Sequence, residues 1–127
     1  MKKLSKLGIY MDHSSAELMN FKDNIITSEV VNLNFTHKQK ENSLSRSEHI
    51  MHNKQQREQS IYYHELADVI KKNDHVVIFG PTEAKIELFN IVKMDQSFSK
   101  IKIELVNSDK LTDTQRHTFV KNYFALK

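Results

Sequence analysis

The sequence contains no cysteine, which excludes disulfide bonds, thiolate metal sites and a cysteine nucleophile. It also has only two glycines and one proline in 127 residues, so flexible or low-complexity linkers are scarce. Long apolar runs are absent too. The N-terminal run that follows Lys6 ends at Met11, before Asp12 and His13, and is too short for the apolar region of a signal peptide. We therefore expect a single cytoplasmic domain that covers residues 1–127 and has no membrane segment.

The charge of the chain is small in total but unevenly distributed. The formal net charge of +3 is too low to indicate a polyanionic partner by itself. Residues 36–57 hold five basic and two acidic side chains, which leaves 14 of the 19 basic and 14 of the 16 acidic residues in balance elsewhere. Because Lys and Arg that neutralise phosphates supply most nonspecific affinity for nucleic acids, this segment is the candidate for binding a polyanion. The alternative is a solvated helix face.

Hydrophobic patterns predict five strands. Two short apolar runs at residues 7–11 and 16–21 are separated by turn-compatible residues and predict a hairpin, and residues 25–35 continue the strand signal. The run at residues 76–79 is β-branched or aromatic throughout, which is typical of a strand covered on both faces. Residues 101–105 alternate apolar and charged side chains, as expected for an edge strand with one exposed face.

Two helix starts are indicated by capping-box spacing. Ser45 and Glu48 open a long helix, and Thr112 and Gln115 open the last one, whose aromatic residues should face the sheet. The first half of the long helix, to about Gln59, is polar nearly all round. We expect this half to project into solvent or toward a partner.

The turn Gly80-Pro81-Thr82 joins the buried strand to a helix at residues 84–94, and Phe79 before it should lie in the core. A helix N-terminus can bind phosphate, but a single glycine with no Gly-Lys-Ser/Thr after it offers few donors. We therefore expect a structural turn in which Thr82 caps the helix. The element order βββαβαβα, with right-handed crossovers, predicts an α/β fold with a mixed sheet and helices on both faces, as in ribonuclease H-like folds.

Several motifs recur in one known family. Asp12, His13 and Ala16 form an Asp-His-x-x-Ala element in the first hairpin, and residues 76–88 read Val-Val-Ile-Phe-Gly-Pro-Thr-Glu-Ala-Lys-Ile-Glu-Leu. Together with the polar loop and long charged helix, they resemble the central domain of archaeal and eukaryotic class I release factors, of the ribosome-rescue factor Pelota and of related bacterial proteins. The resemblance covers most of the chain and implies a ribonuclease H-like fold and a ribosomal partner.

The chain departs from that family in the loop before the long helix. Release factors carry a Gly-Gly-Gln tripeptide there, whereas residues 36–45 contain no glycine and Gln39 is their only glutamine. Pelota-type and bacterial hibernation proteins lack a working tripeptide yet bind the ribosomal A site. The resemblance thus implies a ribosome- or rRNA-binding factor of hibernation, rescue or protection type, without catalysis, cofactor or small-molecule substrate. We predict that the residues in contact with RNA or the ribosome are His37, Lys38, Gln39, Lys40, Arg46, His49, His52, Lys54 and Arg57.

Other functions remain open at this point. Asp12 lies where ribonuclease H-like nucleases place a metal-binding carboxylate, and Glu83 starts a helix nearby, but two-metal hydrolysis needs several converging acidic groups. His49 and His52 are one helical turn apart and could bind a metal with His37, although exposed helix histidines are usually plain surface residues. A protein-interaction module whose basic helix docks an acidic partner is a further alternative, as is a homo-oligomer.

Overall fold

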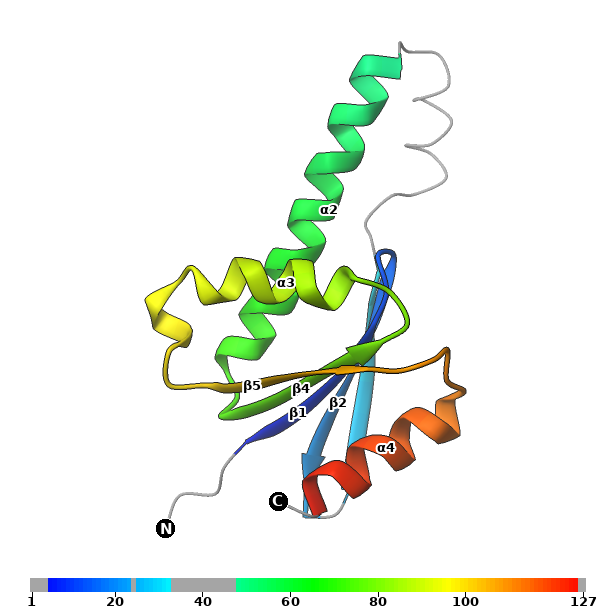
Figure 1. Ribbon diagram of the computed structural model, residues 1–127, viewed down its shortest axis with the longest axis vertical. Coiled ribbons are helices and arrows are strands. Elements are labelled where there is room, and N and C mark those ends of the chain that lie inside the picture. Colours follow the sequence, from blue (N-terminus) through cyan, green and yellow to red (C-terminus); the bar gives the residue numbers. More distant parts are fainter. Residues whose placement is uncertain (1–4, 24, 33–47, 126–127) are drawn as a thin grey trace.

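The computed structural model describes residues 5–23, 25–32 and 48–125, and in the helix Glu48–Lys71 it describes the side chains from Arg57 onward. The elements, in chain order, are β1 (Lys6–Met11), β2 (Ser15–Lys22), β3 (Ile25–Asn32), α2 (Glu48–Lys71), β4 (His75–Gly80), α3 (Ala84–Lys93), the short 3₁₀ helix η1 (Gln96–Phe98), β5 (Lys102–Asn107) and α4 (Asp113–Ala125). This order confirms the predicted α/β arrangement, and within the described ranges the one element beyond the prediction is η1 (Figure 1).

The strands form one mixed sheet in the order β3-β2-β1-β4-β5. The hairpin β1–β2 and the pair β2–β3 are antiparallel, whereas β1–β4 and β4–β5 are parallel. The first turn is tight, since the Asp12 N–H donates to the Ser15 carbonyl over 3.0 Å. The sheet thus combines an N-terminal meander with two crossover units, as the sequence predicts.

The core lies on both faces of β4. All six residues of this strand are buried. Val76 and Ile78 belong to a cluster under α2 and α3, whereas Val77 and Phe79 pack against α4 on the other face (Figure 1). The predicted burial of Phe79 is confirmed, and the helices cover both faces because the central strand is apolar on both.

The predicted exposed face of β5 is confirmed at Lys102, whereas Glu104 on the same face is partly covered. Glu104 is half-buried, because its Oε1 accepts a hydrogen bond from the Tyr123 hydroxyl and lies 2.9 Å from His75 Nε2. Tyr123 of α4 lies over this part of the face, so Glu104 has hydrogen-bond partners there while 34% of its side chain stays exposed. The predicted edge position of the strand is confirmed.

The helix boundaries follow the sequence signals closely. The capping box of α4 is present, since Gln115 N–H donates to Thr112 Oγ1 over 3.2 Å and Thr112 N–H donates to Gln115 Oε1 over 2.9 Å. The helix α3 begins at Ala84 as predicted. Ser45 and the last three residues of the predicted third strand lie outside the described residues. No helix in the described part of the chain is long and apolar enough to cross a membrane.

Candidate functional site

The N-terminal half of α2 stands away from the sheet and from the other described helices (Figure 1). Among the side chains described on this helix, Arg57 is exposed, and burial begins at Glu58 and recurs as far as Ile70. Arg57 therefore marks the point where α2 leaves the body. The predicted projection of this half of the helix is confirmed.

The structure places only part of the predicted contact residues. His49, His52 and Lys54 lie on the described helical backbone of α2, while their side chains lie outside the description. The remaining predicted contact residues fall outside the described residues, namely His37, Lys38, Gln39, Lys40 and Arg46. The proposed metal pair His49 and His52 stays a prediction for the same reason.

The middle of α2, where the helix leaves the body, is hydrogen-bonded to the tip of the first hairpin; we call this part, residues 59–63, the base of α2. The Tyr62 hydroxyl donates to the Asp12 carbonyl over 2.9 Å, and Gln59 Nε2 donates to the His13 carbonyl over 3.0 Å. Tyr62 is almost fully buried, and this burial raises the pKa of its hydroxyl, so the group stays a neutral donor at physiological pH. These bonds fix the direction in which the projecting half of α2 leaves the body.

Glu87 on α3 completes this junction. Its Oε1 accepts a hydrogen bond from the Tyr63 hydroxyl at 2.5 Å, and its Oε2 lies 3.2 Å from His13 Nε2. The Tyr63 bond is the main cause that holds the pKa of Glu87 below its ordinary value, and His13 adds to the effect against partial burial. An ionised carboxylate thus joins the hairpin tip, the base of α2 and the first turn of α3.

The carboxylate proposed for nuclease chemistry supports the turn. Asp12 Oδ1 accepts the backbone N–H of Ser14 over 2.7 Å and that of Ser15 over 2.9 Å, an Asx-type turn. Glu83 is exposed and is the N-cap of α3, and its carbonyl accepts the Glu87 N–H over 3.2 Å, so it stands at the start of the helix as predicted. In the described ranges, no group of three or more His, Asp or Glu side chains is placed to hold a metal ion.

The turn between β4 and α3 is closed by a buried lysine. Lys85 Nζ donates to the Gly80 carbonyl over 3.2 Å and to the Thr82 carbonyl over 2.7 Å, and only 4% of this residue is exposed. The Thr82 hydroxyl accepts the Ala84 N–H over 3.2 Å, but the N-cap of α3 is Glu83, which makes no side-chain capping bond, so the expectation that Thr82 caps the helix is wrong. The Lys85 ammonium thus holds the turn together from the first turn of the same helix.

The two motifs that resemble release factors meet at this junction. His13 from the first motif lies against Glu87 from the second, and the buried Lys85 fixes the turn that precedes α3. Sequence reasoning missed the residues of α2 that complete the junction, Gln59 and Tyr63. The sequence signal that could have identified them is their spacing, because Gln59 and Tyr63 lie one helical turn apart at the point where the helix changes from polar to amphipathic.

A second polar cluster lies on the α4 face of the sheet. Arg116 Nε donates to Glu17 Oε1 over 2.6 Å, His117 Nε2 lies 2.9 Å from Glu17 Oε2, and the Arg116 guanidinium lies over the Tyr10 ring. Arg116 also pairs with Asp113. Burial raises the pKa of Glu17, but the bonds from His117 and Arg116 outweigh it together and leave the pKa below its ordinary value.

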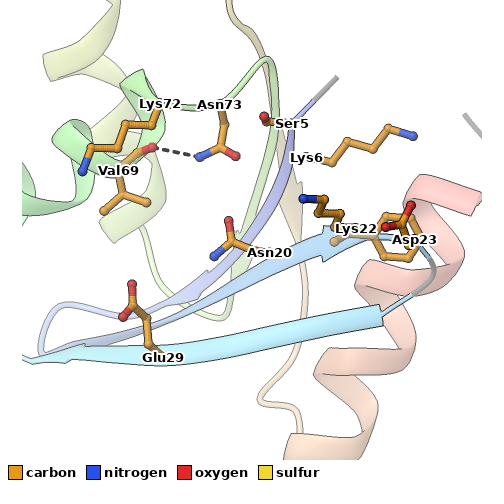
Figure 2. A pocket seen from close by; sticks show the side chains of 10 residues that line it. Ser5, Lys6, Asn20, Lys22, Asp23, Glu29, Val69, Lys72 and Asn73 are labelled. Carbon is orange, nitrogen blue, oxygen red and sulfur yellow. Dashed lines mark hydrogen bonds between the residues drawn. The ribbon is translucent and has the colours of Figure 1, made fainter. Parts of the chain in front are cut away.

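An open hollow of about 900 Å³ lies beside the C-terminal end of α2 (Figure 2). Asn20 and Glu29 rise into it from β2 and β3, and Lys72 and Asn73 border it from the helix side. Asn73 is itself held by a 2.9 Å bond to the Val69 carbonyl. Because this hollow lies at the opposite end of α2 from the projecting half, it is separate from the predicted contact residues. It was not predicted from the sequence.

Comparison with known proteins shows the fold. No protein-family model and no curated protein matches the sequence. Among solved structures, Pelota from Archaeoglobus fulgidus is similar over 95% of this chain, with 10% sequence identity and a TM-score of 0.60. Pelota from Thermoplasma acidophilum is similar over 98% of the chain, with 11% identity and a TM-score of 0.59. The matches cover 32% of each Pelota chain, so the protein has a fold like that of one Pelota domain.

Proposed function

We propose that this protein is a non-catalytic translation factor that binds the ribosome or its RNA, in a hibernation, rescue or protective role. The fold like a Pelota domain supports this function, as do the release factor-like motifs that meet at the base of α2. Since the chain spans about a third of each Pelota, the proposal concerns what this single domain does.

The observation that carries the proposal is the position of the net charge relative to the fold. Residues 36–57 account for the whole formal charge of +3, and they end on the half of α2 that projects from the body (Figure 1). Lys54 and Arg57 belong to the projecting half of α2, where phosphate groups can approach the helix.

The junction at the base of α2 gives this arrangement its mechanical basis. Tyr62 and Gln59 bond the hairpin tip, and Tyr63 bonds Glu87, so three hydrogen bonds hold the helix where it leaves the sheet. A helix fixed at its base loses little freedom when its far half binds, and this pre-organisation favours affinity.

The absence of catalysis is part of the proposal. Residues 36–45 have no glycine that would let the backbone approach a peptidyl-tRNA ester as in release factors. The Asp12 carboxylate accepts two backbone N–H groups in its own turn, which engages one of its oxygens away from any metal. We therefore assign the protein binding and no reaction.

The test is co-sedimentation of purified protein with ribosomes through sucrose. One variant replaces the basic residues of the segment by glutamine, and a matched control replaces the same number of exposed lysines elsewhere, so that both variants change the net charge from +3 to −2. The segment variant carries Lys38→Gln, Lys40→Gln, Arg46→Gln, Lys54→Gln and Arg57→Gln. The control carries Lys72→Gln, Lys100→Gln, Lys102→Gln, Lys110→Gln and Lys121→Gln.

We expect the segment variant to lose at least about tenfold in ribosome affinity while the control keeps most of it, with melting temperatures close to the parent because exposed charges contribute little to folding. Affinity of the parent should fall steeply with added salt, and the segment variant should show a shallower salt dependence. Equal losses in the two variants would mean that net charge, and not this segment, governs binding. A ribosome affinity that is the same in the parent and in both variants and does not change with salt would exclude the proposed contact.

A further inference from the structure

The edge strand β3 is unusually unprotected. It has no lysine or proline, its only charged residue is Glu29, and no strand in the described part of the chain pairs with its outer edge. Ile25 is 65% exposed and Val30 is 62% exposed. Native edge strands are normally blunted by charge, proline or covering elements, since an open apolar edge is a template for another strand. This edge therefore has the character of a pairing surface.

The hairpin turn shows which backbone groups of β3 face outward. Asp12 N–H donates to the Ser15 carbonyl, and both residues continue the β1–β2 register, so they form a hydrogen-bonded pair. Because such pairs alternate along a ladder, the even-numbered residues of β2 direct their N–H and C=O groups to β3, and the odd-numbered residues of β3 direct theirs back. The residues whose backbone groups point to the open edge are therefore Ile26, Ser28 and Val30.

We propose that β3 pairs antiparallel with β3 of a second copy of this chain, with Ser28 opposite the same residue of the other copy. In this register Ile26 lies opposite Val30, and Val30 opposite Ile26, so the three outward-facing residues form hydrogen-bonded pairs along the whole contact. The strongly exposed Val30 thereby gains an apolar cross-strand neighbour on the α4 face.

The other face of the joined sheet is equally complementary. Ile25, the second strongly exposed apolar residue, lies opposite Val31, and Thr27 lies opposite Glu29. No two like charges meet in this register. Shifting the register by two residues in one direction places Glu29 opposite Glu29, and shifting it by two in the other direction places Ile25 opposite Glu29. Charge and apolar pattern therefore favour the register centred on Ser28 over these two neighbouring registers.

The same geometry leaves the projecting helices free. The two-fold axis of an antiparallel strand pair is perpendicular to the sheet, so the two five-stranded sheets continue into each other and their α2 helices lie on one face. In one copy, the N-terminal half of α2 extends beyond the end of the sheet (Figure 1). The two-fold axis reverses this direction in the second copy. The two projecting halves then point in opposite directions, and pairing at β3 does not depend on the proposed function.

The test uses the absence of cysteine from the chain. In Ser28→Cys the only thiols are those at position 28, and a hydrogen-bonded pair places the two Cα atoms about 5.5 Å apart, within disulfide range. In the matched variant Val30→Cys the two thiols lie about 14 Å apart along the strands, beyond disulfide range. Each variant is oxidised with a mild thiol oxidant and analysed on non-reducing gels, with Ser99→Cys on the far side of the molecule as the collision control.

We expect covalent dimer to form at least about tenfold faster in Ser28→Cys than in Val30→Cys or Ser99→Cys. Adding Val30→Lys to Ser28→Cys should abolish this advantage while circular dichroism and melting stay like the parent, because residue 30 is exposed in the monomer. Sedimentation equilibrium of the parent should show a dimer that Val30→Lys dissociates. Equal rates in the three cysteine variants would overturn the register, and a parent that stays monomeric at about 100 μM would overturn self-pairing and leave the edge for a strand of another protein.

Discussion

Gly80 is the residue whose replacement by alanine we expect to cost most. Its φ of +153° is rare for a residue with a side chain, and an added Cβ would lie 2.2 Å from the Met11 carbonyl oxygen. Because Met11 and Gly80 end neighbouring parallel strands, neither backbone can move without loss of sheet hydrogen bonds. We expect Gly80→Ala to lower the free energy of unfolding by about 3 kcal/mol or more, measured by urea denaturation.

The other glycine gives the comparison. A Cβ on Gly8 would lie 2.4 Å from Val120 Cγ2, a side chain on α4 and not backbone. The helix can shift to relieve part of this overlap, so Gly8→Ala should cost less, about 1–3 kcal/mol. If Gly8→Ala proved the more destabilising of the two, backbone conformation at Gly80 would not be the decisive factor.

Single residues also show where sequence reasoning ends. The Lys-x-Glu-Leu motif could be recognised in the sequence, but the partners of Lys85 and Glu87 could not. Lys85 reaches carbonyls in its own turn, which local spacing allows, whereas Glu87 contacts His13, 74 residues earlier in the chain. Such a contact depends on the β1–β4 pairing, which brings the two strand ends together. A sequence pattern has no direct signal for it.

At the scale of elements, β4 is the strand whose packing we expect to dominate stability. The Phe79 ring is fully buried, with its centroid 5.4 Å from that of Tyr10 and 4.3 Å from that of Phe119. Phe79→Ala should cost about 3–5 kcal/mol in urea denaturation, since it removes a buried ring and leaves a cavity between sheet and α4. Ile86→Ala on α3, where the side chain is 43% exposed, should cost less than about 1 kcal/mol. Similar losses for the two variants would show that the core is not centred on β4.

Element types were predicted well because their signals are local. The hairpin, the buried strand and the capping box of α4 each depend on residues within a few positions of one another. The partial burial of Glu104 on β5 was not predicted because it depends on another element. Glu104 alternates with apolar residues as an exposed side chain would, yet Tyr123 of α4 supplies a partner that makes its partial burial favourable.

At the scale of the whole molecule, the candidate sites differ in how far they were predictable. The basic segment follows from counting charges, and the projection of α2 follows from its polar first half. The hollow beside α2 and the open edge of β3 require the strand order, because β2 and β3 contribute to the hollow and β3 is the last strand of the sheet. Strand order is set by long-range pairing, which hydrophobic periodicity does not encode.

The carboxylates predict how the whole fold responds to acid. Hydrogen bonds outweigh burial in holding the pKa of Glu17 low, and bonded partners likewise lower the pKa of Glu87 and Asp95. Each group binds its proton more weakly in the folded protein than in the unfolded chain, whose carboxyl pKa is about 4. Their contribution to stability is therefore present above that value and lost as the pH falls through the lower folded pKa. The melting temperature should stay nearly level between about pH 7 and pH 5 and fall steeply below about pH 4.

Glu17→Gln separates this effect from general acid denaturation. Only 11% of the Glu17 side chain is exposed, and its bonds to Arg116 and His117 are charge-assisted, so the variant should lose about 1–3 kcal/mol at neutral pH. The glutamine cannot be protonated in this range, so the variant should lose less stability on acidification. The two stability curves should therefore approach each other as the pH falls below the unfolded carboxyl pKa of about 4 and through the lower folded pKa of Glu17. Curves that remain parallel from neutral pH to acid would mean that Glu17 is protonated at the same pH in the folded and unfolded states, and that its ion pairs with α4 do not stabilise the fold.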